Sequence, residues 1–100
     1  MKNTTYEIRA YRATGAWIEG TINDLHFQAK IYDEDSIHGI NDGRVIKLCV
    51  WDEAKRNESG LSAATIINYE RGWDVEPKTA ADRHMLDAVI AYFENFRIAA

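Results

Sequence analysis

The sequence contains little cysteine, proline or glycine and no long hydrophobic run. Its 100 residues include one cysteine, one proline and six glycines. A single cysteine excludes an intramolecular disulfide framework, and so few prolines and glycines exclude a collagen-like or low-complexity chain. No run approaches the roughly 20 apolar residues that span a bilayer, and the N-terminus lacks a signal-peptide core. We therefore expect a cytoplasmic protein with no membrane partner.

Recognisable catalytic and metal-binding motifs are missing as well. None of the three histidines stands at ligand spacing from another. No serine, cysteine or threonine occurs in a nucleophile turn, and no glycine-rich loop of the phosphate-binding type is present. The acidic loop that begins at Asp33 lacks the later ligand positions of a calcium loop. We therefore expect a protein that is not an enzyme, with no metal site and no cofactor.

The overall charge is mildly acidic. A net charge of −4 removes the general positive field that non-specific nucleic-acid binders need, so we do not expect direct binding of DNA or RNA duplexes. A local basic pocket remains compatible with this charge. With 46% hydrophobic and 28% charged residues, the composition is that of an ordinary globular protein. One domain over residues 1–100 is expected, because this length supports a single core.

Alternating apolar and polar residues predict four to five strands between about residues 5 and 70. The clearest alternation covers 25–32, directly after an Asn-Asp pair at 23–24 that is typical of a hairpin turn. In the preceding strand, Gly20 indicates either a bulge or the close approach of another backbone. We interpret the charged segment 52–60 as an exposed loop. The other strands are expected at 6–11, 17–22, 44–51 and 63–69.

The C-terminal part predicts one helix over about residues 79–98. Pro77 ends the strand region, and Thr79 followed by Asp82 resembles a capping box. Leu86, Val89 and other apolar residues then recur at helical spacing. The expected fold is therefore α+β, an antiparallel sheet of four to five meandering strands with one C-terminal helix packed on one face.

The sheet face opposite this helix is expected to stay open. Three tryptophans and five tyrosines are more than one small core needs, and rings on an open sheet face usually mark a ligand or subunit contact. Lys30 and Lys47 could add positive charge on the strand faces. The ordinary alternative is that both lysines are simply solvated.

A polar and aromatic stretch before the helix carries most of the candidate binding residues. Asn68 offers a donor and an acceptor, and Arg71 offers five donors in a planar fork. Tyr69 and Trp73 could stack a base. Arg44, beside the turn-rich loop, is a second candidate cation. The alternative is a packed hinge, in which the aromatic rings seal the junction and Arg71 pairs with a nearby carboxylate.

Two segments carry a family resemblance. Phe-Gln-Ala-Lys at 27–30 and Asn-Tyr-Glu-Arg-Gly-Trp-Asp at 68–74, within a likeness from about Trp17 to Pro77, resemble a small family of phages and Firmicutes known only as a domain of unknown function. In size, element order and content of arginine and aromatic residues, the chain is also similar to phage anti-Thoeris sponge proteins of the first type. Those proteins are oligomers that sequester cyclic ADP-ribose isomers, and some also hold cyclic oligonucleotides.

This resemblance implies a phage anti-defence protein in the cytoplasm of an infected bacterium. It would be a homo-oligomer that binds and sequesters a cyclic nucleotide immune signal without cleaving it. The alternative is a phage inhibitor or adaptor that binds a host defence protein directly through an acidic, aromatic surface. In the sequestering protein, Arg44 and Arg71 would bind phosphates, Phe27, Tyr69 and Trp73 would stack rings, and Asn68 would read a base or ribose edge.

Overall fold

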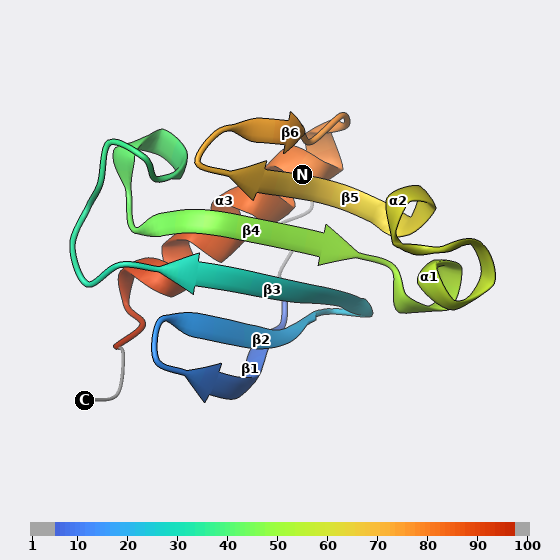
Figure 1. Ribbon diagram of the computed structural model, residues 1–100, viewed down its shortest axis with the longest axis horizontal. Coiled ribbons are helices and arrows are strands. Elements are labelled where there is room, and N and C mark those ends of the chain that lie inside the picture. Colours follow the sequence, from blue (N-terminus) through green and yellow to red (C-terminus); the bar gives the residue numbers. More distant parts are fainter. Residues whose placement is uncertain (1–5, 98–100) are drawn as a thin grey trace, which may run out of the picture.

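The computed structural model describes residues 6–97, which form an antiparallel sheet of six strands with one long helix behind it (Figure 1). Each strand pairs with its neighbour in sequence, so the sheet is a simple meander. The elements are β1 (Ile8–Thr14), β2 (Trp17–Ile22), β3 (Leu25–Ile31), the 3-10 turn η1 (Ile40–Asp42), β4 (Val45–Trp51), α1 (Glu53–Ser59), α2 (Leu61–Ala64), β5 (Thr65–Glu70), β6 (Trp73–Val75) and α3 (Ala80–Glu94).

The α+β class and the helix on one sheet face are confirmed, and two details differ from the prediction. The sheet gains a sixth strand, β6, whose three residues are too few to show an alternating pattern. The loop interpretation of 52–60 is wrong, because α1 occupies most of it. The Asp52 side chain caps this helix by accepting a hydrogen bond from the Lys55 backbone N–H at 3.1 Å. Charged residues were read as a loop, yet Glu, Ala, Lys and Arg are good helix formers.

Helix α3 begins where the capping signal predicted. The Thr79 hydroxyl accepts a hydrogen bond from the Asp82 backbone N–H at 3.0 Å, which satisfies one of the free donors of the first turn. The apolar stripe of the helix then packs on the sheet. At its centre the Phe93 ring meets the Phe27 ring edge-on, with centroids 5.8 Å apart. The helix therefore closes the core on one face of the sheet (Figure 1).

Gly20 permits the closest backbone approach in the core. It lies directly opposite Phe27 across β2 and β3. A Cβ atom on Gly20 would lie 1.9 Å from the Arg9 carbonyl oxygen and 2.7 Å from Phe27 Cε2. The predicted close approach is confirmed, since no side chain fits between the neighbouring strand and the aromatic ring.

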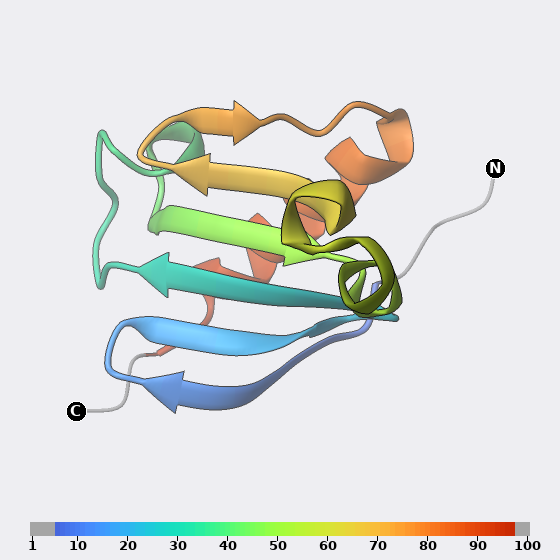
Figure 2. The ribbon, with the colours of Figure 1, turned by 45° about the vertical axis from the view of Figure 1, so that its right-hand side comes forward.

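The opposite sheet face is covered only at one end. Figure 2 shows α1 and α2 projecting in front of the sheet at that end while α3 runs behind it. The remainder of this face, across β2 to β5, carries no helix (Figure 1). Within residues 6–97, none of the helices combines the length and apolar character required to cross a membrane.

Candidate functional site

The strand register aligns polar side chains into rows across the open face. Trp17, Lys30, Lys47 and Glu70 are successive cross-strand neighbours on β2 to β5, and we call them the Trp17 row. A second row crosses the sheet beside the first. Each of its members is two residues from a member of the Trp17 row on the same strand and therefore lies on the same face. This amide row consists of Gln28, Cys49 and Asn68 on β3 to β5.

The Trp17 row combines an exposed aromatic ring with two ammonium groups. The Nζ atoms of Lys30 and Lys47 lie 5.5 Å and 5.6 Å from the centroid of the Trp17 ring, within the range of cation–π attraction. Lys47 also pairs with Glu70 at 3.0 Å between Nζ and Oε1. In the described part of the chain, Lys30 makes no salt bridge. Among the described residues, Lys30 is thus a cation without a carboxylate partner, over a partly exposed ring.

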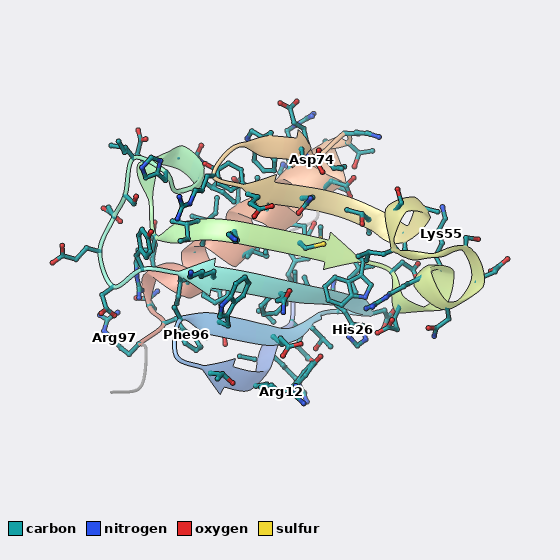
Figure 3. All side chains as sticks on the ribbon, in the orientation of Figure 1. Arg12, His26, Lys55, Asp74, Phe96 and Arg97 are labelled. Carbon is teal, nitrogen blue, oxygen red and sulfur yellow. The ribbon has the colours of Figure 1, made fainter. Side chains whose placement is uncertain are left out.

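Members of both rows line one shallow depression of about 170 Å³, together with Leu48 and Tyr69, whereas Lys30 is not among the lining residues. On the amide row, Asn68 Nδ2 donates a hydrogen bond to Asp74 Oδ2 at 2.9 Å. Figure 3 shows this face toward the viewer, with Asp74 on the β6 side, Arg12 on the β1 side and His26 toward α1. The depression therefore brings together the Trp17 ring, the ion pair of Lys47 with Glu70 and two amides.

Cys49 lies between the two amides but is not an activated nucleophile. Burial raises the pKa of the Cys49 thiol above its ordinary value, and this effect outweighs the opposing influence of a hydrogen bond with Thr65 and of the Arg56 charge. The thiol therefore stays protonated near neutral pH, whereas a reactive cysteine needs a lowered pKa. The raised pKa agrees with a structural rather than a reactive role for this thiol.

A separate aromatic cluster closes the other end of the open face, beneath α1. The His26 ring stacks on Trp51 with centroids 6.0 Å apart, and the Arg56 guanidinium lies 5.5 Å from the Trp51 ring centroid. His26 Nδ1 also lies 3.9 Å from a Glu53 carboxylate oxygen. Trp51 is only 9% exposed, so this end holds α1 in place and leaves the depression as the accessible part of the face.

Two of the predicted binding residues, Phe27 and Arg44, have structural partners within the chain. Phe27 is 0% exposed and packs against Phe93, so its ring cannot stack a ligand without opening the core. Arg44 binds the C-terminal end of α3, where one of its terminal nitrogens donates to the carbonyl oxygens of Phe93 and Phe96. Its Nε donates to the Tyr32 carbonyl oxygen at 2.7 Å. Arg44 therefore connects the loop before β4 to the end of α3 through hydrogen bonds.

The predicted stretch before the helix is divided between two environments. Asn68 and Tyr69 border the depression, although the Tyr69 hydroxyl is engaged with the His38 carbonyl oxygen at 2.8 Å. Trp73 is 38% exposed and meets Tyr69 edge-on with centroids 5.0 Å apart. Arg71 is exposed in the β5–β6 turn, with a left-handed φ of 57°. Trp73 and Arg71 do not border the depression.

Trp17 and Gln28 are the residues that sequence reasoning missed. Gln28 and Lys30 alternate with the buried residues of β3 and so lie on its outward side, and Gln28 borders the depression. Trp17 stands at the first position of β2, where it was counted only as strand. The available signal was the odd spacing of Trp17 from Gly20 and Ile22. Side chains alternate between the two faces of a strand, so Trp17 must face outward if Gly20 and Ile22 face the core.

Metal ligands do not gather in the described residues. Across 6–97, no three histidine, cysteine, aspartate or glutamate side chains come together in a way that could hold a metal ion. The side chains around the depression include the Trp17 ring, the amides of Gln28 and Asn68, and Lys47 paired with Glu70. The site is thus suited to non-covalent recognition of a flat, polar ligand, and Lys30, over the Trp17 ring, adds a cation for an anionic group.

Comparison with known proteins identifies a family. No match was found among curated proteins or among solved structures. One family matches over residues 16–94, a span that starts just before β2 and ends with the last residue of α3. It includes both rows of the open face and leaves out only β1 among the strands. The chain therefore belongs to the family described as a domain of unknown function, DUF7678.

Proposed function

We propose that this protein is a non-enzymatic binding protein that holds a cyclic nucleotide on its open sheet face. The observation that carries the proposal is the Trp17 ring flanked by the ammonium groups of Lys30 and Lys47. A base that stacks on an aromatic side chain gains about 1–3 kcal/mol, and a phosphate beside an ammonium group makes charge-assisted hydrogen bonds. Asn68 would contribute polar contacts at the opposite side of the depression.

The size of the depression supports a site shared between subunits. Its volume is about 170 Å³, whereas pockets that enclose a ligand of drug size are typically about 300–1,000 Å³. One subunit would therefore cover only part of a cyclic nucleotide. We propose that a second copy of the chain covers the remainder, which makes the binding form a homo-oligomer.

The resemblance to anti-Thoeris sponge proteins supports the identity of the ligand and the biological role. On that basis the ligand is a cyclic ADP-ribose isomer or a cyclic oligonucleotide, and binding keeps this immune signal from its effector. Holding rather than cleaving the ligand fits a face whose Cys49 thiol is kept protonated by burial. The protein would then act as a phage anti-defence protein in an infected bacterium.

A pair of matched tryptophan variants tests the proposal. Trp17 and Trp73 are 37% and 38% exposed, so Trp17→Ala and Trp73→Ala remove similar exposed rings from two candidate sites. Calorimetric titration with a cyclic ADP-ribose isomer and with a cyclic dinucleotide should show binding about 10- to 100-fold weaker for Trp17→Ala and unchanged for Trp73→Ala. Equal affinities for the two variants would contradict the site.

The fate of the ligand tests the sequestering mechanism. After mixing, the protein is denatured by heat and the released ligand is analysed by mass spectrometry. Recovery of the intact ligand is expected, because equilibrium binding leaves its covalent bonds unchanged. Recovery of cleaved ligand only would contradict the non-enzymatic reading.

A second candidate function is binding to a host defence protein. The loop after β3 favours it, because Asp33, Glu34 and Asp35 are exposed there and Ile37 is 84% exposed. An acidic loop with an apolar tip could occupy a basic channel of a partner. A pull-down from bacterial extract without added nucleotide distinguishes the two functions, since a stable stoichiometric partner retained by Trp17→Ala would favour the second.

A further inference from the structure

We infer that the open-face site selects adenine over guanine through the Asn68 amide, whose orientation Asp74 fixes. This inference rests on the proposed nucleotide binding at the Trp17 row. The hydrogen bond between Asn68 Nδ2 and Asp74 Oδ2, at 2.9 Å, is the observation behind it. It adds to the proposed function the identity of the base.

The first step concerns which atoms Asn68 has left for a ligand. An ionised carboxylate accepts hydrogen bonds and donates none, so the amide nitrogen of Asn68 must face Asp74. Rotating the amide by half a turn would bring two oxygens together. Within the described residues, the Asn68 side chain makes no other hydrogen bond. One N–H and the carbonyl oxygen therefore remain, a donor beside an acceptor.

The second step compares this pair with the edges of the purines. Adenine presents its N6 amino group beside the N7 acceptor, which matches a donor and an acceptor side by side and allows two hydrogen bonds. Guanine presents two acceptors, N7 and O6, at the same edge. With guanine, the Asn68 oxygen would face another acceptor. A good bidentate pair of this kind discriminates against the wrong base by about 10- to 100-fold.

The third step is whether a base can reach Asn68 from the stacking ring. Asn68 lies on β5 and Trp17 on β2, three strand spacings or roughly 14 Å away along the sheet. Lys47 on β4 lies between the two residues, and its Nζ is 5.6 Å from the Trp17 ring centroid. Trp17 and Asn68 accordingly border the same depression. A purine in this depression can therefore contact both Trp17 and Asn68, with Lys30 left to bind its phosphate.

The test compares cyclic di-AMP with cyclic di-GMP, which share charge and backbone and differ in their bases. We expect the native protein to bind cyclic di-AMP about 10- to 100-fold more tightly. Asp74→Asn removes the carboxylate that fixes the orientation of the Asn68 amide, so the ratio of the two affinities should fall toward one. Asn68→Ala removes the amide itself and should abolish the preference while weaker binding persists. Glu76→Gln, a change of another exposed carboxylate near β6, should leave the preference intact.

The possible outcomes separate this inference from the proposed function. Equal binding of both dinucleotides that still depends on Trp17 would overturn the adenine preference and leave nucleotide binding standing. A guanine preference, or a preference unchanged in folded Asp74→Asn and Asn68→Ala, would also overturn it. Absence of binding to both dinucleotides would overturn the inference alone if a cyclic ADP-ribose isomer still bound in a Trp17-dependent manner, and absence of binding to all three ligands would overturn the proposed function as well. Circular dichroism spectra of each variant confirm that differences in affinity do not reflect unfolding.

Discussion

Replacing Arg44 by alanine tests whether this residue holds the fold together or binds a ligand. Arg44 lies in the loop before β4, and its partners are carbonyl oxygens at the end of α3 and in the chain after β3. These oxygens include the Phe93 carbonyl in the last turn of α3, where helix carbonyls lack the amide partner four residues on. The positive charge also lies at the negative end of the helix dipole. We therefore expect Arg44→Ala to destabilise the protein.

The size of the effect follows from the geometry. One nitrogen, Nη1, carries two hydrogens, so its bonds to Phe93 and Phe96 use both, and a contact of 3.4 Å with Glu94 adds little. Hydrogen bonds to charged groups contribute about 1.5–3 kcal/mol each when buried. Arg44 is only half-buried, and water can replace it at these carbonyls, so we take a loss of about 2–3 kcal/mol in total. That corresponds to roughly 10–20 °C in Tm for a chain of this length.

The assay is urea unfolding followed by circular dichroism, with Arg97→Ala as control. Arg97 lies near the same helix end but makes only long contacts of 3.4 Å, so its loss should stay within about 0.5 kcal/mol. Arg44→Lys should recover part of the stability, since an ammonium group keeps the charge but lacks the planar fork. If Arg44→Ala left stability unchanged and instead weakened nucleotide binding, the structural assignment of Arg44 would be refuted.

Three further changes have defined outcomes. Gly20→Ala should lower the free energy of unfolding by more than about 2 kcal/mol, because the added methyl group meets the Arg9 carbonyl oxygen and the Phe27 ring; thermal unfolding at native-like stability would contradict this. Phe27→Ala should cost about 3–5 kcal/mol by leaving a cavity against Phe93, whereas loss of ligand affinity in a fully stable variant would return Phe27 to the binding site. Burial raises the pKa of the Cys49 thiol, so the folded state binds the thiol proton more tightly than the unfolded state does. The protonated thiol therefore contributes to stability at neutral pH, and this contribution is lost as the pH rises through the folded pKa. Urea midpoints measured from about pH 8 to 10 should thus fall more for the native protein than for Cys49→Ala, and parallel curves would contradict the shift.

The sequence predicted those elements whose periodic pattern of apolar residues, or capping motif, is long enough to distinguish a helix from a strand. The capping box at Thr79 and the periodic apolar residues gave the position of α3, and the alternation over 25–32 gave the central strands. Strand β6 was missed because three residues cannot show a period. Helix α1 was missed because a charged segment suits both an exposed loop and an exposed helix, and the Asp52 cap was the signal that distinguished them.

The site was harder to predict because it depends on register. Trp17 and Lys47 are thirty residues apart in sequence, and only the pairing of β2, β3 and β4 brings Lys47 within 5.6 Å of the Trp17 ring. Arg44 was predicted as a binding cation beside the turn-rich loop. Its contacts with Phe93 and Phe96 could not be predicted, because these residues lie far along the chain. Asn68 was recognised from its own hydrogen-bonding groups, and the role of Asp74 in orienting it needed the turn geometry.

The most direct test of nucleotide binding at the open face uses the indole N–H resonances of the three tryptophans. Each ring has its own environment, since Trp17 borders the depression, Trp51 lies beneath Arg56 and Trp73 packs on Tyr69. In a nuclear magnetic resonance titration with cyclic di-AMP, we expect the Trp17 indole signal and the backbone amides of Lys30 and Asn68 to shift in a saturable manner, with the Trp73 signal unchanged. A saturable shift confined to Trp73 and its turn would contradict the central claim.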